Sequence, residues 1–138
     1  MADVFTPAQR SRVMQAVRSR DTSPELIVRK LATGLGYRYR LHGKNVPGSP
    51  DLVFAGLRKV VFVHGCFWHR HSCPRGQSTP AANKKFWLAK FARNVARDAA
   101  VRRLLRREGW RSLVIWECQL STKRLERTAL RLKRFLES

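Results

Sequence analysis

The sequence predicts an α/β domain in which one mixed β-sheet is flanked by helices. The chain has 138 residues, 43% of them hydrophobic, and its apolar patterns follow the order helix, helix, three strands, helix, strand, helix. A chain of this length can build one hydrophobic core, and this hydrophobic content excludes a disordered polycation. Because no linker, repeat or low-complexity segment interrupts the order, we expect a single domain over residues 1–138.

Two helices are predicted at the start of the chain, each from a hydroxyl residue followed by proline. Thr6-Pro7 begins a basic helix that runs to about Arg18, and Ser23-Pro24 begins a second helix that Gly36 ends. Residues 37–41 then alternate aromatic and basic side chains, which is typical of a half-exposed strand. A turn region rich in Gly, Asn and Pro follows it.

Two apolar strands are predicted next, over residues 52–55 and 59–63, and Gly56-Leu57-Arg58 connects them as a hairpin. Residues 65–82 are rich in Cys, His, Pro and Gly, so we expect them to be irregular. The second half of the sheet and its covering helices must therefore come from the segment after residue 82.

A long helix is predicted over residues 83–107, ended by Gly109. Its buried stripe comprises Trp87, Phe91 and Val95. Residues 110–116 contain an apolar run typical of a central strand. A last helix is expected from about Thr122, and at helical spacing it buries Leu125, Ala129, Leu132 and Leu136.

The charge of the chain indicates a polyanionic partner. It has 29 Lys and Arg against 9 Asp and Glu, a formal net charge of +20. Self-repulsion at this charge destabilises the compact state unless an anion binds, and nucleic acid is favoured over an anionic membrane. No apolar run approaches the ~18 residues of a spanning helix, so no membrane partner is expected. The N-terminus has no secretion signal, which predicts a cytoplasmic protein.

A metal site is predicted after the second apolar strand. Cys66, His71 and Cys73 lie within eight residues, and Cys118 follows the last predicted strand. Three thiolates and one imidazole make a closed tetrahedral Zn²⁺ shell, which indicates a structural metal. The alternative is that Cys66 and Cys118 are small buried residues and His71 is solvated, and His64 or His69 is a possible substitute ligand.

Hydrolytic chemistry is predicted at one end of the hairpin. Asp51 precedes one strand and His64 ends the next, so an antiparallel pairing brings the two side chains to the same sheet end. A carboxylate there can hold Mg²⁺, and His69 is suited to accepting a proton from an attacking water. Taken singly, Asp51 is equally consistent with a turn residue and each histidine with a surface or core residue.

Aromatic residues lie beside these polar residues. Phe67 and Trp68 stand between the predicted zinc ligands, in a loop too polar for core, and exposed aromatics on a basic protein can insert between bases or stack on them. The alternative for both is packing beneath the zinc loop. For Trp87, packing within its helix stripe is the stronger interpretation.

The chain resembles the very short patch repair mismatch endonucleases of bacteria. The resemblance spans nearly the whole chain, and its most specific motifs are His64-Gly65-Cys66-Phe67-Trp68-His69 and Trp116-Glu117-Cys118. Further matching residues are Met14, Arg20-Asp21-Thr22, Glu25, Pro50-Asp51, Phe62, His71, Cys73, Phe86-Trp87, Asn94, Arg97-Asp98 and Gly109-Trp110-Arg111. The chain departs from the relatives where Val63 replaces a hydroxyl residue and where Arg70 and Ser72 fill positions that can be histidine.

The resemblance implies a restriction-endonuclease-like fold and Mg²⁺-dependent nicking of one strand, 5′ to the thymine of a T:G mismatch left by deamination of 5-methylcytosine. It also implies double-stranded DNA as the partner of a monomer in a bacterial cytoplasm, associated with the nucleoid while acting on DNA, with bacterial repair proteins as further partners.

The resemblance further implies residue roles. The catalytic residues would be Asp51, His64, His69 and Glu25. Mg²⁺ would be held by Asp51 and the carbonyl of Val63, and structural Zn²⁺ by Cys66, His71, Cys73 and Cys118. The residues that enter or bind DNA would be Met14 in an N-terminal helical segment over residues 1–20, Phe67, Trp68, Trp87, Lys90 and Asn94.

Two rival hypotheses remain from the sequence. The first keeps the nuclease chemistry in a related nicking enzyme that acts on another lesion or on foreign DNA. The second is a zinc-stabilised DNA-binding protein without catalysis, in which Asp51, His64 and His69 would have no chemical role.

Overall fold

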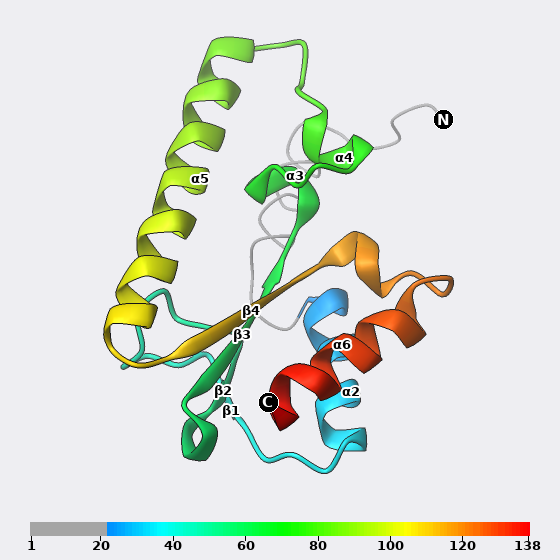
Figure 1. The fold of residues 1–138 in the computed structure, drawn as a ribbon. Coiled ribbons are helices and arrows are strands. Elements are labelled where there is room, and N and C mark those ends of the chain that lie inside the picture. Colours follow the sequence, from blue (N-terminus) through cyan, green and yellow to red (C-terminus); the bar gives the residue numbers. More distant parts are fainter. Residues whose placement is uncertain (1–21) are drawn as a thin grey trace.

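A four-stranded mixed sheet carries helices on both of its faces in the computed structural model, which describes residues 22–138 (Figure 1). The strands lie in the order β1 (Arg40–Leu41), β2 (Leu52–Phe54), β3 (Lys59–His64) and β4 (Arg111–Trp116). The first two pairings are antiparallel, and β3 pairs with β4 in parallel. The predicted fold class, a mixed sheet flanked by helices, is confirmed.

The hairpin between β2 and β3 places the ends of these strands side by side. A 3₁₀ turn, η1 (Ala55–Leu57), connects them, and Arg58 takes a left-handed conformation with φ 54°. The register pairs Leu52 with Val61, so the residue before β2 lies opposite the C-terminal end of β3. Because β4 runs parallel to β3, its C-terminal end reaches the same edge of the sheet.

Both faces of β2 and β3 are buried, which explains why Leu52–Phe54 and the middle of β3 are continuously apolar. On one face, Leu52, Phe54, Val61 and Ile115 form a core with α2 (Ser23–Gly34) and α6 (Leu125–Glu137). The core residues of the other face are Val53, Val60, Phe62 and, from α5 (Lys84–Arg107), Leu105. The alternation of side chains along each strand separates the two cores.

Shorter helices connect the sheet edge to the long helices. After β3 come α3 (Cys66–His69) and α4 (Pro74–Gln77), and a 3₁₀ turn, η2 (Glu117–Leu120), follows β4. Figure 1 shows α3 and α4 above the C-terminal end of β3, with α5 rising along one side of them.

A buried lysine joins the sheet to the last helix. Nζ of Lys59 donates to the main-chain oxygens of Phe135 at 2.7 Å, Leu136 at 3.2 Å and Ser138 at 2.6 Å. The last carbonyls of a helix have no partner within it, so this ammonium satisfies the end of α6 and fixes it against β3.

The element order is confirmed for the described residues, but several bounds and environments differ. The strand expected over residues 37–41 is reduced to Arg40–Leu41, and the last helix begins at Leu125. Residues 65–82 contain α3 and α4 instead of being wholly irregular. The basic helix expected from Thr6-Pro7 lies outside the described residues.

Two predictions of burial were wrong. The strand expected to be central is β4, which lies at an edge of the sheet among the described residues, and it is apolar because helices cover both of its faces. Val95 was expected on the buried stripe of α5 but is 46% exposed, because only part of this helix packs on the sheet. No helix within residues 22–138 is long and apolar enough to cross a membrane.

Candidate active site and zinc site

The candidate active site lies at the sheet edge where β3 ends and β2 begins. Asp51 precedes β2, and its Oδ2 accepts a hydrogen bond of 2.6 Å from the amide of Val63 in β3. Asp51, His64 and His69 all line one open cleft, which also reaches Glu25 at the start of α2. The hairpin thus brings together the acid and the imidazoles that the sequence predicted to converge.

The Asp51 carboxyl group is held in an environment that opposes its charge. Burial raises its pKa to about 6, and the nearby charge of Glu25 also raises it, while the Val63 amide lowers it. Asp51, Glu25 and His42 each offer a ligand atom, and these atoms lie within 4.8 Å of one another. Two carboxylates at this separation favour a bound cation, because a cation relieves both their repulsion and their desolvation.

A cation already approaches this acidic group from α2. Nη2 of Arg29 lies 3.3 Å from Oε2 of Glu25 and 3.4 Å from Nε2 of His42. The guanidinium therefore fixes Glu25 on one side, while Asp51 faces the cleft on the other. The carboxylate oxygens suit Mg²⁺, which prefers oxygen ligands, so the residues present fit the expected cation.

Two stacked imidazoles and a carboxylate form the other half of the site. The rings of His64 and His69 lie parallel with centroids 3.8 Å apart, and Nδ1 of His69 lies 2.6 Å from Oδ2 of Asp98. Burial would raise the pKa of Asp98, but its hydrogen bond to His69 lowers it overall, so the group stays ionised. A carboxylate on Nδ1 leaves Nε2 as the imidazole nitrogen available to the cleft.

His64 is buried and uncharged. Burial, reinforced by the neighbouring His69, lowers its pKa to about 3. Its Nδ1 is a buried atom that has no hydrogen-bond partner among the described residues. A neutral imidazole in this position can exchange hydrogen bonds with a ligand but cannot contribute positive charge.

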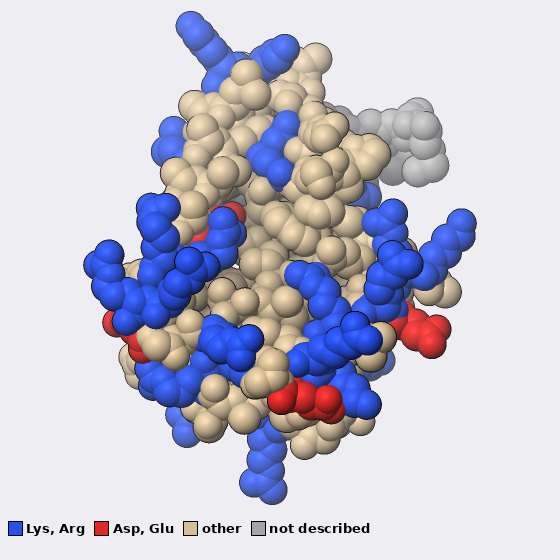
Figure 2. Space-filling view, in the orientation of Figure 1, with Lys and Arg blue, Asp and Glu red and all other residues tan. Residues whose placement is uncertain are grey.

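Helix α5 supplies one long wall of the cleft. Its lining residues recur at intervals of three and four, and they are Lys90, Arg93, Asn94, Arg97, Asp98, Val101 and Arg102. This spacing puts them on one face of the helix. Most are basic, and Figure 2 shows Lys and Arg gathered along the lower half of α5, so the wall suits a phosphate backbone.

The predicted aromatic residues pack against each other at the end of the cleft near α3. Phe67 lies edge-on to Trp68 at 5.0 Å, and Trp87 lies 5.7 Å from Trp68. Trp68 is only 9% exposed, so the prediction of an exposed loop aromatic was wrong, because α3 turns its side chain toward α5. Phe67 and Trp68 line the cleft, whereas Trp87 does not.

Two polar residues of α5 hold this aromatic group in place. Nδ2 of Asn94 donates to the main-chain oxygen of Trp68 at 3.1 Å, and Nζ of Lys90 lies 5.6 Å from the centre of the Trp68 ring. Both residues line the cleft, as their predicted DNA contacts require. Met14, the remaining predicted contact, lies outside the described residues.

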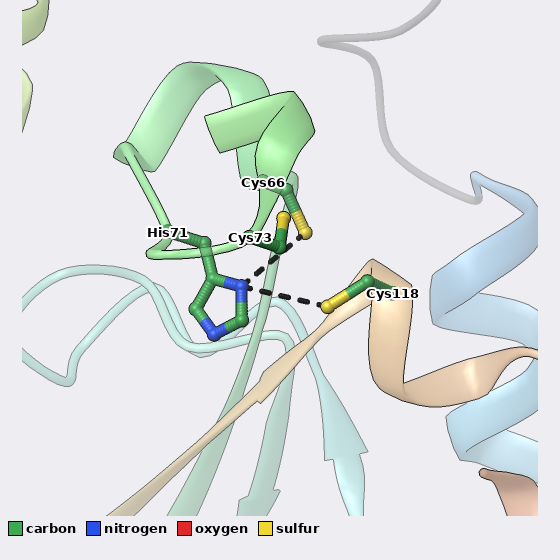
Figure 3. Close-up of side chains that lie close together, drawn as sticks. All are labelled: Cys66, His71, Cys73 and Cys118. Atoms are coloured by element: carbon green, nitrogen blue, oxygen red, sulfur yellow. Dashed lines mark hydrogen bonds between the residues drawn. The ribbon is translucent and has the colours of Figure 1, made fainter. Parts of the chain in front are cut away.

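The four predicted zinc ligands come together in space. Figure 3 shows Cys66 on α3, His71 and Cys73 on the loop toward α4, and Cys118 on η2, with the sulfurs close to His71. The four ligand atoms lie within 4.8 Å of one another, and Nδ1 of His71 is 3.9 Å from Sγ of Cys66 and 3.4 Å from Sγ of Cys118. Tetrahedral Zn²⁺ with ordinary bond lengths separates nitrogen and sulfur ligands by about 3.6 Å, so this cluster fits a structural zinc.

The surroundings of the thiols also favour a bound metal. Burial raises the pKa of Cys66 to about 12. For Cys73, burial opposes ionisation, but hydrogen bonds, first from His71, lower the pKa to about 6. A buried thiol among other thiols resists deprotonation, and a bound Zn²⁺ supplies the positive charge that stabilises the thiolates.

Contacts around the zinc cluster tie it to the active-site edge. The ring of His71 stacks on Trp116 with centroids 4.4 Å apart, and Trp116 in turn contacts His64 edge-on at 5.2 Å. Oε1 of Glu117 accepts a hydrogen bond of 3.2 Å from the amide of Cys66. The Cys and His cluster is therefore linked to the strand ends that carry the candidate catalytic side chains.

The sequence did not single out His42, Arg29 or Asp98 for a role in the site. Arg29 lacks a pattern that marks it, because only the packing of α2 against the sheet edge brings it to this group. His42 directly follows β1, and the antiparallel pairing of β1 with β2 brings it opposite Asp51, whose main-chain oxygen accepts from the His42 amide at 3.2 Å. For Asp98 a signal exists, since it lies four residues after Asn94 and therefore on the same face of α5.

Comparison with known proteins places this site in a class. A family model described as DNA mismatch endonuclease Vsr matches residues 2–75. The type II nicking enzyme V.XorIIP of Xanthomonas oryzae pv. oryzae is 49% identical over 121 residues, which cover 88% of each chain. The type II nicking enzyme V.NmeAIP of Neisseria meningitidis serogroup A is 42% identical over 130 residues, covering 94% of this chain and 92% of that one.

The DNA mismatch endonuclease Vsr of Escherichia coli strain K12 is 44% identical over 120 residues, which cover 87% of this chain and 76% of that protein. Together with the cleft and its hydrolytic side chains, these similarities make the chain a DNA-nicking endonuclease, a hydrolase that acts on DNA. The chain belongs to the Vsr DNA mismatch endonuclease family.

Proposed function

We propose that this endonuclease hydrolyses one phosphodiester bond of duplex DNA at the edge formed by Asp51, His64 and His69. The observation that carries this proposal is that the Asp51 carboxylate and the His69–Asp98 pair line the same cleft, whose wall is basic. A phosphate in the cleft can contact both groups at once. A binding protein without catalysis gives no reason for a buried carboxylate at this position.

His69 is proposed to take the proton from the attacking water. Its Nδ1 is engaged by Asp98 at 2.6 Å, which orients the ring and stabilises the imidazolium that forms. His64, neutral and stacked on His69, is proposed to hydrogen-bond the scissile phosphate. Glu25 is proposed to orient solvent beside Asp51, as its contact with Arg29 fixes its direction.

Asp51 is proposed to hold Mg²⁺ with the carbonyl of Val63. The N–H of Val63 already points to Asp51, and the N–H and C=O of one strand residue point to the same side. Mg²⁺ bound there would neutralise charge on the phosphate and its leaving oxygen. The four-ligand Cys and His cluster is assigned the structural role, because it leaves no open position.

The similarities to type II nicking enzymes favour a target in DNA that is broader than the T:G mismatch alone. Proteins named as type II nicking enzymes are 49% and 42% identical to this chain, while the mismatch endonuclease is 44% identical over a smaller share of its own length. We therefore propose a nicking enzyme whose target is a lesion or a site in foreign DNA, of which a T:G pair is one specific candidate.

The aromatic group favours a T:G pair as that candidate. Phe67 and Trp68 line the cleft beside the catalytic edge, and the matching family model is described as a mismatch endonuclease. A wobble pair is easier to unstack than a normal pair, and each unstacked step costs about a few kcal/mol. Insertion of these rings would select the mismatch through its deformability. A single asymmetric lesion also suits a monomer, and repair proteins would complete the patch.

Nicking assays on duplexes that differ at a single position distinguish the candidate targets. Purified protein with Mg²⁺ is incubated with labelled duplexes that contain T:G, T:A, other mismatches or other lesions in the same flanking sequence. Nicking of T:G DNA well above T:A DNA supports the mismatch target. Equal nicking of both excludes it and leaves sequence or another lesion as the determinant.

Asp51→Asn tests the catalytic assignment. The amide keeps an oxygen that accepts from the Val63 amide but loses the charge that holds a cation, so nicking should fall by about 100-fold or more while DNA affinity changes little. Glu126→Gln, an exposed acid of α6, is the control and should nick at the original rate. Retained turnover in Asp51→Asn would exclude the proposed role of Asp51.

A further inference from the structure

Helix α6 carries a strongly basic face that the nicking site does not use. Its outward cations, named here the α6 basic face, are Arg124, Arg127, Arg131 and Arg134, with Lys123 in the turn before them. Figure 2 shows Lys and Arg gathered over this helix. No residue of α6 lines the catalytic cleft.

The face is opposite the side of α6 that packs on the sheet. At 3.6 residues per turn, Arg127, Arg131 and Arg134 point within about 60° of one another. Leu132 and Leu136, on the other side of the helix, are buried against α2 and the sheet. The cleft is walled by α5, which packs on the other face of the sheet.

The arrangement of charge costs stability in the absence of an anion. Arg127 and Arg131 are four residues apart and Arg131 and Arg134 three, and like charges at these spacings repel across a helix surface. Lys123, Arg124 and Arg127 also crowd the N-terminal end of α6, where the helix dipole disfavours positive charge. Acids stand at these spacings only at the two ends of the face, where Glu126 follows Lys123 by three residues and Glu137 follows Arg134 by three. Arg127 and Arg131, in its middle, have no acid three or four residues away.

Within residues 22–138 the structure shows no ion pair between the α6 basic face and a carboxylate. Arg131 donates to Oε1 of Gln119 at 3.1 Å, and Arg124 lies 4.0 Å from Sγ of Cys118. Gln119 is uncharged and Cys118 is a predicted zinc ligand, so neither contact pairs a carboxylate with Arg127, Arg131 or Arg134.

We propose that the α6 basic face is a second DNA-backbone contact surface, which holds a segment of duplex outside the catalytic cleft. From Arg127 to Arg134 the helix extends about 10 Å, which matches about three phosphates along one strand. The contacts carry no base readout, because arginines on an exposed convex helix reach phosphates and not base edges. DNA is favoured over an anionic membrane because Leu130 is the single large apolar side chain of α6 that is exposed, too little to anchor a helix in lipid.

The consequence is that one protein molecule can contact two segments of DNA. The segment in the cleft is positioned for nicking, while the α6 basic face holds a second segment and lets the protein transfer between them. This second contact does not depend on hydrolysis, so it is measured without Mg²⁺ and its failure is distinct from a failure of the proposed nicking activity.

The test is capture of a second duplex. Full-length protein is bound to an immobilised short duplex at saturation without Mg²⁺, and binding of a fluorescent matched duplex is then measured against salt concentration. Arg127→Gln/Arg131→Gln/Arg134→Gln should lower capture about tenfold or more and reduce the salt slope by about 2 to 3, because each phosphate contact contributes about 0.9.

Matched variants separate a local surface from bulk charge. Lys30→Gln/Arg38→Gln/Arg40→Gln removes the same number of charges from exposed positions on α2 and near β1 and should capture like the original protein. Arg127→Lys/Arg131→Lys/Arg134→Lys keeps the charge and should also capture normally. The double variant Arg127→Gln/Arg134→Gln, which leaves the contact of Arg131 with Gln119, gives the same test if the triple variant does not fold.

Equal loss in the control triple variant, or no loss in the α6 variants, overturns the proposal. Flotation with vesicles of phosphatidylcholine and phosphatidylserine tests whether the α6 basic face binds an anionic membrane instead of DNA. Loss of vesicle binding in the α6 variants with unchanged duplex capture overturns the proposal in favour of a lipid surface.

Discussion

At the scale of single residues, the chemistry of the site depends on which carboxylate faces which partner. Asp51 and Asp98 both line the cleft, but burial raises the pKa of Asp51 to about 6, while the hydrogen bond to His69 leaves the pKa of Asp98 below its usual range. A bound cation would therefore stabilise the charged form of Asp51, whereas Asp98 already has a partner. This difference suits Asp51 to metal binding and Asp98 to positioning His69.

Replacement of Asp98 should impair catalysis without weakening DNA binding. In Asp98→Asn the ring of His69 loses the carboxylate that orients it and stabilises its protonated form, so kcat for nicking should fall by about 10- to 1,000-fold. The affinity for duplex DNA should stay the same. Steady-state nicking and duplex binding, with Glu126→Gln as control, measure both effects. An unchanged kcat contradicts the positioning role.

Replacement of Asp51 should stabilise the protein in the absence of Mg²⁺. A carboxyl group whose pKa is raised on folding stabilises the folded state fully at pH values below its pKa in the unfolded chain, and that contribution is lost as the pH rises through its folded pKa of about 6. The neutral amide of Asp51→Asn avoids this loss, so at pH 8 the substitution should raise the free energy of unfolding by about 1 to 3 kcal/mol. Below pH 4 the difference should vanish. Urea denaturation at both pH values, in buffer without Mg²⁺ and without chelator, tests it, and equal stability at pH 8 contradicts the buried environment.

Sequence patterns identified the residues of the hairpin but not all of their partners. Asp51 and His64 stand at strand ends, where an antiparallel pairing fixes their proximity, so their convergence was predictable. Asp98 and Arg29 reach the site from helices whose packing angle no local pattern specifies, and His42 reaches it through the register of the short strand β1 with β2. The side of the helix on which Asp98 lies was predictable, but the distance between α5 and His69 was not.

At the scale of elements, the loop from α3 to α4 depends on close backbone contact. A Cβ atom added at Gly76 would overlap the main-chain oxygen of His71, and Gly76 is buried against that residue. Since His71 is a predicted zinc ligand, the position of this glycine controls the geometry of the metal cluster.

Gly76→Ala should therefore weaken the zinc site. The added methyl group has to displace the backbone that carries His71, so bound zinc should fall and the free energy of unfolding should drop by about 2 kcal/mol or more. Metal analysis of the purified variant and its thermal unfolding measure the two effects. Gly56→Ala is the matched control, because a Cβ there meets nothing within 4 Å. Full zinc content and unchanged unfolding in Gly76→Ala would show that the loop adjusts.

The helices and strands themselves were largely predictable, with errors that have physical causes. The apolar run of β4 indicated a central strand, but β4 lies at the edge of the described sheet, and helices on both faces leave most of its residues partly buried. The residues around Cys66 lack helical periodicity over more than a turn, so α3 and α4 were not predicted. The same short helix α3 buries Trp68, which composition alone had placed in an exposed loop.

At the scale of the whole molecule, the net charge of +20 acts in opposite directions on stability and on DNA binding. The repulsion among the cations of α5 and α6 opposes the compact state, and a polyanion relieves it. The contacts of Lys59 hold α6 on the sheet against this repulsion, and a zinc ion in the Cys and His cluster would do the same for the strand ends.

Salt should therefore stabilise the free protein while it weakens the complex. Raising NaCl from about 0.1 M to about 1 M shortens the Debye length from about 10 Å to about 3 Å, so the Tm of the free protein should rise by several degrees. Over the same range the affinity for matched duplex DNA should fall by orders of magnitude. Thermal scans and binding titrations at the same salt concentrations measure both trends. A Tm that falls with salt would show that self-repulsion does not limit stability.

The sequence by itself determined the α/β class, the mixed sheet, the Cys and His residues of a candidate zinc cluster and the strand-end position of Asp51 and His64. These follow from local periodicity and from the places of residues at strand ends. The tertiary structure alone decided that Asp98 contacts His69, that Arg29 contacts Glu25 beside Asp51, and that Trp68 is buried. Such contacts depend on how helices pack on the sheet, a balance of many small interactions between segments far apart in the chain.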